Sequence, residues 1–263
     1  MKESPPRISA AIITYNEEKN IKDCLESVLF ADEIVVVDSY SSDKTEEIAK
    51  HFPVHFLKRK FDNFSGQKNY ALSQTTGEWV LLIDADERVS PKLQGEIQAL
   101  LASDPPPAAY RIKRESYFFG KPLRYSGTQK DAPIRLFPRS SVRYEQPIHE
   151  EIVTSLPVRH LQSRILHFST ENAARYNQKL RPYISLEIQN LKINKKPVTW
   201  IDVLGRPLAR FFQRLIPQAG LLDGLTGLFF AYHSARYEFK KWNGYLKEKK
   251  SQAQAEVDRS PGT

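Results

Sequence analysis

The chain has 263 residues and a formal net charge of +8, enough for one α/β domain with an appended segment or for two small domains. Its one cysteine, Cys24, excludes an internal disulfide and predicts a reducing compartment, and the short apolar run before Asn16 predicts neither a secretory leader nor a membrane span. The positive charge allows nucleic acid, an anionic membrane surface or a phosphorylated substrate as partner.

The first hundred residues alternate between strand and helix patterns. Apolar runs predict strands at 7–15, 33–38, 53–58 and 78–84, and helical spacing predicts helices at 17–30, 43–52, 66–75 and 91–102. Ser42 and Ser90 are the expected N-caps of the second and fourth helices, and Cys24 is expected to be a small buried residue of the first. This order predicts a parallel sheet that binds its ligand beyond the carboxyl ends of the strands.

The stretch "GEWVLLIDADER" (77–88) brings carboxylates to one of these strand ends. Side chains two residues apart on an extended chain point to the same side, so Asp84 and Asp86 are expected to face one point. Two such carboxylates repel each other unless a cation lies between them, and their oxygens suit Mg²⁺ or Mn²⁺. The alternative is a polar strand end followed by a helix, which explains Ser90 and Pro91 without a metal.

Beyond the break at "SDPPPAA" (103–109) the pattern changes. Strands are expected within 109–120, 132–139, 148–154 and 163–169, and helices follow from Thr170. The predicted organisation is a domain at 1–169 with halves 1–104 and 105–169, a helical amphipathic extension at 170–250 and a disordered tail at 251–263.

Six segments in order resemble the family 2 inverting glycosyltransferases, which have the GT-A fold: "IITYNEEKNI", "EIVVVDSYSSDKT", "GQKNYAL", "GEWVLLIDADERV", "IRLF" and "IHEEI". The expected fold class is therefore α/β, a Rossmann-like mixed sheet with helices on both faces, plus a C-terminal helical extension. The segment "GLLDGLTGLFFAYHSARYEFKKW" (220–242) resembles the subgroup that contains the lipopolysaccharide core β-1,4-glucosyltransferases.

The resemblance assigns the nucleotide pocket to the ends of the first two strands. It implies that Asp38 contacts the uracil or ribose of a UDP-sugar, and that four residues line the pocket: Thr14, Tyr15, Asn16 and Glu17. For Asp38 the alternative is a local Asx turn. Lys68 and Asn69 are expected to touch the diphosphate or to support the aspartates, and a solvated surface position is the alternative for Lys68.

The resemblance also assigns the metal and the base. It implies that Asp86 ligates Mg²⁺ or Mn²⁺, that Asp84 points to the ribose or the metal, and that His149 completes the metal shell. Asp131 is the expected general base and Glu150 its rival. The commoner family pattern has an acidic pair where this chain has Lys130 and Asp131, and a surface Asp131 and a core His149 are the alternatives.

The C-terminal third keeps helical spacing in its apolar residues and carries many basic ones. The apolar positions are Leu221, Leu225, Leu228, Tyr232, Phe239, Trp242 and Leu246, and the segment 206–250 is rich in Arg and Lys. Such a stripe either packs on the catalytic domain or lies in a membrane interface.

The resemblance therefore implies a cytoplasmic glycosyltransferase on the inner face of the cytoplasmic membrane. It would move a hexose, glucose by expectation, from a UDP-sugar to a lipid-linked or core oligosaccharide, without a nucleic-acid partner. The alternatives are a nucleotidyltransferase that forms nucleotide-sugars, although "IITYNEEKN" lacks the glycine-rich phosphate loop, and a basic nucleic-acid-binding protein, which leaves the acidic strand ends unexplained.

Overall fold

The structure is a computed structural model that describes residues 7–145, 151–170 and 173–259. They divide into two compact units, the first formed by residues up to 116 together with 130–169, and the second by 117–129 together with the chain from 170 onward. The predicted catalytic domain at 1–169 and helical extension at 170–250 stay predictions. The structure differs from the prediction in placing the segment 117–129 with the second unit.

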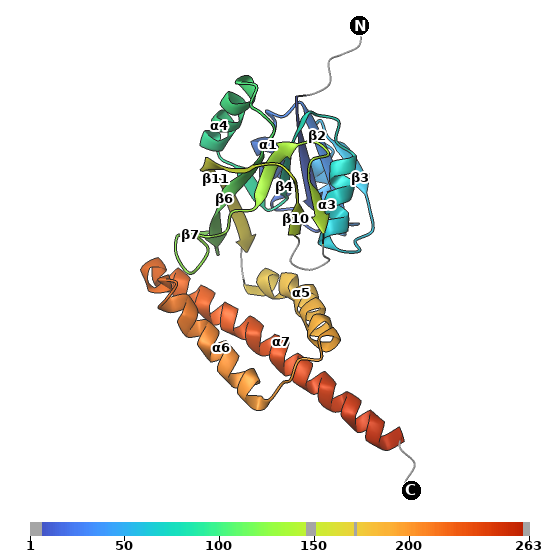
Figure 1. The fold of residues 1–263 in the computed structure, drawn as a ribbon, viewed down its shortest axis with the longest axis vertical. Coiled ribbons are helices and arrows are strands. Elements are labelled where there is room, and N and C mark those ends of the chain that lie inside the picture. Colours follow the sequence, from blue (N-terminus) through green and yellow to red (C-terminus); the bar gives the residue numbers. More distant parts are fainter. Residues whose placement is uncertain (1–6, 146–150, 171–172, 260–263) are drawn as a thin grey trace. The chain divides into compact units, whose positions relative to one another are not determined.

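Four parallel strands form one half of the mixed sheet in the first unit, in the order β3, β2, β1, β4 (Figure 1). They are β1 (Ile8–Thr14), β2 (Glu33–Asp38), β3 (His55–Lys58) and β4 (Trp79–Asp84), and the helices are α1 (Ile21–Ser27), α2 (Thr45–Ala49), α3 (Phe64–Ser73) and α4 (Pro91–Ala102). All of β1 is buried, with alternate residues in two different core clusters, because both faces of the sheet are covered.

Of the two serines predicted as helix N-caps, only Ser90 is a cap in the structure. Ser90 caps α4, because its side chain accepts a hydrogen bond from the Leu93 N–H and Pro91 occupies the first turn, as predicted. Ser42 does not cap α2, which begins only at Thr45; its N–H donates to Asn16 Oδ1 at 2.8 Å instead. Ser42 therefore joins the loops after β1 and β2.

The other half of the sheet is antiparallel and continues in the order β8, β6, β11, β5 from β4. These strands are β5 (Glu87–Val89), β6 (Ala109–Phe118), β8 (Ile134–Pro138) and β11 (Val158–Thr170), and β7 (Lys121–Leu123) pairs with β6. β9 (Arg143–Glu145) and β10 (Glu151–Val153) form a separate pair. Since β5 pairs with β11, Glu87 lies opposite His167, beside the end of β4.

The second unit is helical. It contains α5 (Ala173–Ile193), α6 (Trp200–Leu215), a short 3-10 helix (Gly220–Asp223) and α7 (Gly224–Arg259), with a small core of Ile188, Val203, Trp242, Tyr245 and Leu246. α7 continues to Arg259, whereas a disordered tail was expected from residue 251. Among the described helices, none has an apolar stretch long enough to cross a bilayer.

Candidate functional site

The candidate site lies where β1, β2 and β4 end. Thr14 is the register partner of Asp38, and Ile13 is the register partner of Asp84, so the parallel strands bring these residues to one edge of the sheet. After Asp84 the chain turns at residues 85–86 before β5 begins at Glu87. The predicted grouping of polar strand ends is thus present.

Asp84 and Asp86 have different partners, although an extended chain would place them on one side. Asp84 forms ion pairs with Arg114 Nη2 at 3.0 Å and with Arg135 Nη2 at 2.5 Å. Asp86 Oδ1 lies 3.6 Å from His167 Nε2. The turn at 85–86 separates the two carboxylates into two neighbouring environments.

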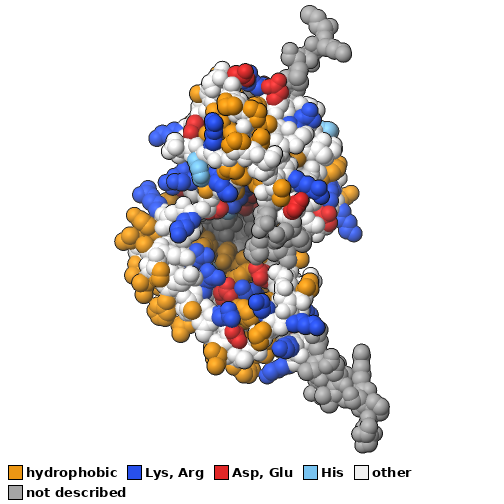
Figure 2. All heavy atoms as spheres, in the orientation of Figure 1, with side chains coloured by type: hydrophobic (Ala, Val, Ile, Leu, Met, Phe, Trp, Pro, Cys, Tyr) orange, Lys and Arg blue, Asp and Glu red, His pale blue; other side chains and the backbone are white. Residues whose placement is uncertain are grey.

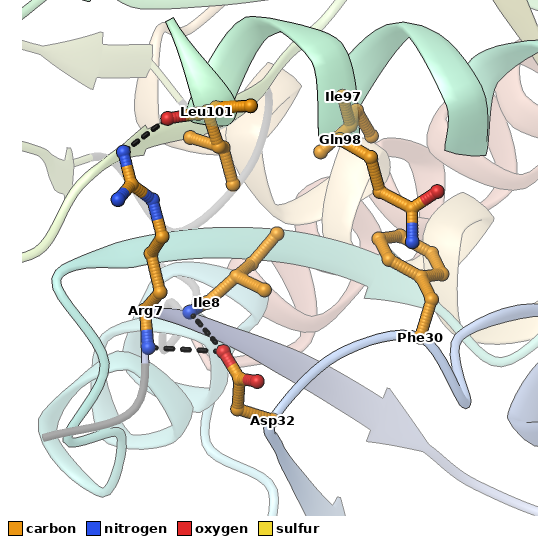
Figure 3. A pocket seen from close by; sticks show the side chains of 8 residues that line it. Arg7, Ile8, Phe30, Asp32, Ile97, Gln98 and Leu101 are labelled. Carbon is orange, nitrogen blue, oxygen red and sulfur yellow. Dashed lines mark hydrogen bonds between the residues drawn. The ribbon is translucent and has the colours of Figure 1, made fainter. Parts of the chain in front are cut away.

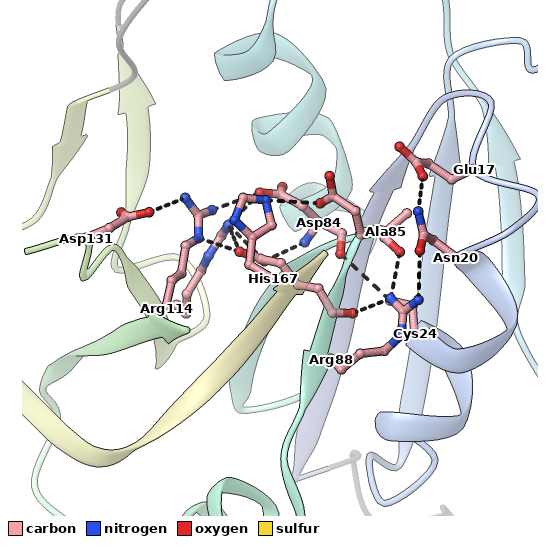
Figure 4. A network of polar contacts seen from close by, with 12 residues as sticks. Glu17, Asn20, Cys24, Asp84, Ala85, Arg88, Arg114, Asp131 and His167 are labelled. Atoms are coloured by element: carbon pink, nitrogen blue, oxygen red, sulfur yellow. Dashed lines mark hydrogen bonds and ion pairs between the residues drawn. The ribbon is translucent and has the colours of Figure 1, made fainter. Parts of the chain in front are cut away.

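Two arginines and two acids form a buried ionic network around this turn (Figure 4). Glu87 is fully buried and accepts hydrogen bonds from Arg114 Nε at 2.5 Å and from Arg135 Nη2 at 2.9 Å. Burial alone would raise the pKa of Asp84, but the charges of Arg135, Lys68 and Arg114 outweigh it and hold that pKa well below its ordinary value. Asp84 is therefore ionised at neutral pH.

Asp131, the predicted base, is connected to this network by Arg114. Its Oδ2 accepts a hydrogen bond from Arg114 Nη1 at 3.2 Å, and its side chain keeps 41% of its surface exposed. Figure 4 shows Arg114 between Asp131 and Asp84. We call residues 84–87 the acidic turn. The structure therefore brings the predicted base and the acidic turn into contact with one guanidinium group.

His167 is a site residue that the sequence interpretation missed. Burial alone would lower the pKa of His167, but the charge of Asp86 and a hydrogen bond to it raise that pKa above its ordinary value. The only available signal was a histidine within the apolar run "RILHF". Two further residues with a predicted metal or base role, His149 and Glu150, lie outside the described residues.

The donor groups at the turn suit a divalent cation. Asp84 Oδ1 and His167 Nδ1 are buried and have no hydrogen-bond partner among the described residues. Within that part of the chain, no three His, Cys, Asp or Glu side chains are already gathered as a metal site. Mg²⁺ is usually held by one or two carboxylates together with substrate phosphates.

The loop after β1 is fastened to the loop after β2. Asn16 adopts a positive φ of 52°, and its N–H donates to Ser41 Oγ at 2.8 Å. Thr14 is buried, and its hydroxyl has no hydrogen-bond partner among the described residues; Tyr15 is 58% exposed. Glu17 is buried and accepts a hydrogen bond from Asn20 Nδ2 at 2.7 Å.

Asp38 is fully buried and has local partners. Its two carboxylate oxygens accept hydrogen bonds from the N–H of Ser41 at 2.8 Å and from the hydroxyl of the same residue at 2.5 Å. Asp38 therefore has local partners, but its backbone bond reaches three residues on, whereas the Asx turn considered as an alternative reaches two. The contact with uracil or ribose stays a prediction.

Lys68 and Asn69, both on α3, have different contacts. Lys68 is buried, with its amine 5.2 Å from the centre of the Tyr144 ring, and is close enough to lower the pKa of Asp84. The predicted surface alternative for Lys68 is wrong. Asn69 donates to the Tyr144 carbonyl at 2.8 Å and accepts from the Tyr144 N–H at 2.9 Å, so it supports β9.

Cys24 is buried within the protein, as predicted, and Arg88 makes local contacts near the acidic residues. Cys24 is fully buried, and burial raises the pKa of its thiol, which makes it a poor nucleophile. Arg88 donates to the carbonyls of Ala85 at 3.2 Å and Glu87 at 2.9 Å, and to Asn20 Oδ1 at 3.1 Å. Arg88 therefore braces the acidic turn from within the protein.

A small cavity beside the first residues of β1 lies at the opposite end of the strands (Figure 3). The N–H groups of Arg7 and Ile8 both donate to Asp32 Oδ2 at 2.9 Å, and the Arg7 guanidinium donates to the Leu101 carbonyl. These polar groups are paired with one another, so the cavity offers mainly apolar surface and no catalytic constellation.

Comparison with known sequences gives one family. Residues 9–170 match the model of glycosyl transferase family 2. The chain is 31% identical over 242 residues to the lipopolysaccharide core biosynthesis glycosyltransferase LpsC of Rhizobium meliloti (strain 1021), which covers 88% of this chain and 89% of LpsC. It is also 31% identical over 224 residues to the SPbeta prophage-derived glycosyltransferase SunS of Bacillus subtilis (strain 168), which covers 79% of this chain and 50% of SunS.

Among solved structures, the chain is similar to residues 1–349 of TarS from S. aureus in complex with UDP-GlcNAc. The TM-score is 0.50 at 16% sequence identity, and the match covers 95% of this chain and 92% of that chain. At this identity the likeness shows the fold alone.

Proposed function

Because the chain belongs to glycosyltransferase family 2 and has the GT-A fold predicted from its sequence, we propose that it is an inverting enzyme that moves a hexose from a UDP-sugar to a sugar of the lipopolysaccharide core or a related cell-envelope glycan. Glucose is the expected sugar. The acidic turn at the carboxyl edge of the sheet carries the proposal. The name of LpsC supports the acceptor class, and the UDP-GlcNAc complex of TarS supports the donor class.

The nucleotide of the donor is proposed to bind at the ends of β1 and β2. A buried hydroxyl without a partner costs free energy, and a hydrogen bond from a ligand to Thr14 would recover it. The exposed Tyr15 ring offers a face for the base. Asn16, Glu17 and Asp38 hold the two loops through the hydrogen bonds described above.

Asp86 is the proposed first ligand of Mg²⁺ or Mn²⁺, with Asp84 Oδ1 at the same turn and His167 on the neighbouring strand β11 as further candidates. When bound, the cation neutralises the diphosphate as negative charge develops on the leaving UDP. His149 stays a prediction for the same shell. Lys68 contributes a buried positive charge near Asp84.

Asp131 is the proposed general base. Its carboxylate takes the proton of the acceptor hydroxyl while that oxygen attacks C1 of the sugar from the face opposite UDP. The bond between C1 and the phosphate oxygen breaks, and its electron pair leaves with UDP. Glu150 stays the rival for this role.

An assay of UDP release tests the proposal, with a panel of UDP-sugars and truncated core acceptors. Activity should require Mg²⁺ or Mn²⁺ and should be nearly abolished in Asp86→Ala, because the carboxylate holds the cation. Glu47→Ala, an exposed carboxylate on α2, is the control and should retain activity. Full turnover in EDTA would contradict the metal part of the proposal.

The second unit is proposed to bind the membrane surface, where a lipid-linked acceptor is located. Apart from Trp200, whose ring lies under the amine of Lys250, ten large apolar residues of α6, α7 and the segment between them are each at least half exposed: Ile201, Leu204, Leu208, Phe212, Ile216, Leu221, Leu222, Leu225, Phe229 and Tyr232. Figure 2 shows hydrophobic side chains gathered over this part of the unit. We call these ten residues the apolar surface.

A further inference from the structure

We propose that Arg114 is a positioning residue for sugar transfer, which holds the carboxylate of Asp131 in a fixed direction relative to the acidic turn. The inference rests on the proposed function, because it takes Asp131 as the base. Arg114 lies on β6 and was not among the residues that the sequence singled out.

Each nitrogen of the Arg114 side chain contacts a different carboxylate. Nε lies 2.5 Å from Glu87, Nη2 lies 3.0 Å from Asp84 and Nη1 lies 3.2 Å from Asp131. The Arg114 N–H also donates to the Asp131 carbonyl at 2.9 Å. Asp131 is thus held by Arg114 through both its main chain and its side chain.

Charge compensation explains only two of these three contacts. Asp84 and Glu87 are buried or nearly so, and both also pair with Arg135, which gives two positive and two negative charges. Asp131 is 41% exposed and needs no buried partner for its charge. The contact between Arg114 and Asp131 therefore fixes the orientation of the Asp131 carboxylate.

The guanidinium group can fix this orientation because it is planar and rigid. With Nε on Glu87 and Nη2 on Asp84, the plane of the group is set, and the direction of Nη1 is set with it. A base that is displaced by about 1 Å can cost roughly 10²-fold in rate. A lysine has one amine and cannot contact the three carboxylates in this geometry.

The experiment compares four variants and one control variant with the wild type. Arg114→Gln alone leaves the buried negative charges in excess, so Arg114→Gln/Glu87→Gln is the second variant, in which one charge of each sign is removed. Asp131→Asn and the combination Arg114→Gln/Glu87→Gln/Asp131→Asn are the third and fourth variants. They complete a mutant cycle that measures how the change at Arg114 and Glu87 depends on Asp131. Arg111→Gln is the matched control, because Arg111 lies on the same strand and donates to the Ala132 carbonyl at 2.9 Å without touching Asp131.

Three quantities are measured for each variant that retains a wild-type thermal transition: transfer to acceptor, hydrolysis of the donor by water, and the KM for the donor. In Arg114→Gln/Glu87→Gln, transfer should fall by roughly 10²-fold while donor KM and donor hydrolysis stay close to wild type. The triple variant should transfer no more slowly than Asp131→Asn alone, because both changes act through the same carboxylate. Arg111→Gln should transfer at the wild-type rate.

The outcomes separate this inference from the proposed function. If Asp131→Asn still transfers sugar, the base is another group and the proposed function needs a different base. If Asp131→Asn is inactive but Arg114→Gln/Glu87→Gln transfers at the wild-type rate, Asp131 stands as the base and the positioning role is wrong. A parallel loss of hydrolysis and transfer, with a raised donor KM, would also overturn it, because Arg114 would then support the donor site as a whole.

Discussion

Arg135 is the most deeply buried arginine of the ionic network and shows what a charged side chain requires inside a sheet. It is 1% exposed and lies between Asp84 and Glu87. Removing a charge from water is costly, and only close opposite charges compensate for the cost. The position of Asp84 at the end of β4 therefore depends on a side chain of β8.

Arg135→Met should lower the free energy of unfolding by about 3–5 kcal/mol, because it leaves a buried negative charge without its partner. Urea denaturation at neutral pH measures this change. Arg111→Met, at an exposed position on β6, should stay within about 0.5 kcal/mol of wild type. Equal effects of the two substitutions would show that the network contributes no stability.

At the scale of elements, the second unit has an apolar stripe with two different environments. Trp242 and Leu246 lie in the small core, whereas Leu221, Leu225 and Tyr232 are exposed. Several basic residues of the same segment are engaged within the unit: Arg206 with Asp202, Arg210 and Lys241 with Glu238, and Arg214 with the Ser126 carbonyl. Part of the stripe thus packs within the second unit, and membrane contact stays a proposal for the exposed part.

Membrane binding should depend more on the apolar surface than on charge. Leu204→Ser/Leu208→Ser/Leu225→Ser should reduce co-sedimentation with anionic liposomes at both low and high salt, because insertion of apolar side chains is not screened. A variant with Arg236, Lys240, Lys241 and Lys247 changed to Gln should lose only the salt-sensitive part.

Activity on a soluble acceptor is the folding control for both variants. If the wild type stays in the supernatant with anionic vesicles at low salt, the membrane role is wrong. If the triple serine variant changes the oligomeric state of the protein instead, the apolar surface is an interface between copies of this chain.

The elements also show which parts of the fold were accessible from the sequence. The continuous runs of β1, β2 and β4 were predicted because a strand buried on both faces is apolar throughout. β5, β7 and β9 have three residues each, too few for an alternating pattern, and were missed. Asp84 and Asp86 belong to one stretch and were found, whereas Arg114, Arg135 and His167 reach the site through strand pairings that no local pattern encodes.

At the scale of the whole molecule, the second unit is assembled from two separate parts of the chain. The segment 117–129 leaves the first unit at Ser116 and returns to it at Lys130. Asp223 holds this segment, because its carboxylate accepts hydrogen bonds from the N–H groups of Arg124 at 2.9 Å and Tyr125 at 3.1 Å, and from Ser126 Oγ at 2.8 Å. One carboxylate thus organises the junction of the two parts.

Asp223→Ala should free the segment 117–129 and lower the free energy of unfolding by about 1–3 kcal/mol, since the buried Ser126 hydroxyl and two backbone N–H groups would lose a charged acceptor. Hydrogen exchange should accelerate at the N–H groups of Arg124 and Tyr125, with little change in β1 or β4. Unchanged exchange at Arg124 and Tyr125 would show that the carboxylate does not hold the segment. Glu47→Ala on α2 is the control.

The separation of Arg124 and Asp223 along the chain also affects the order in which the protein folds during synthesis. They are 99 residues apart in the chain, and a ribosome adds about 5–20 residues per second, so on the order of 5–20 s pass between their synthesis. Strands β8 and β11 are translated within that interval. The nascent sheet can therefore close before the segment 117–129 meets its carboxylate, and the second unit is completed last, when α7 leaves the exit tunnel.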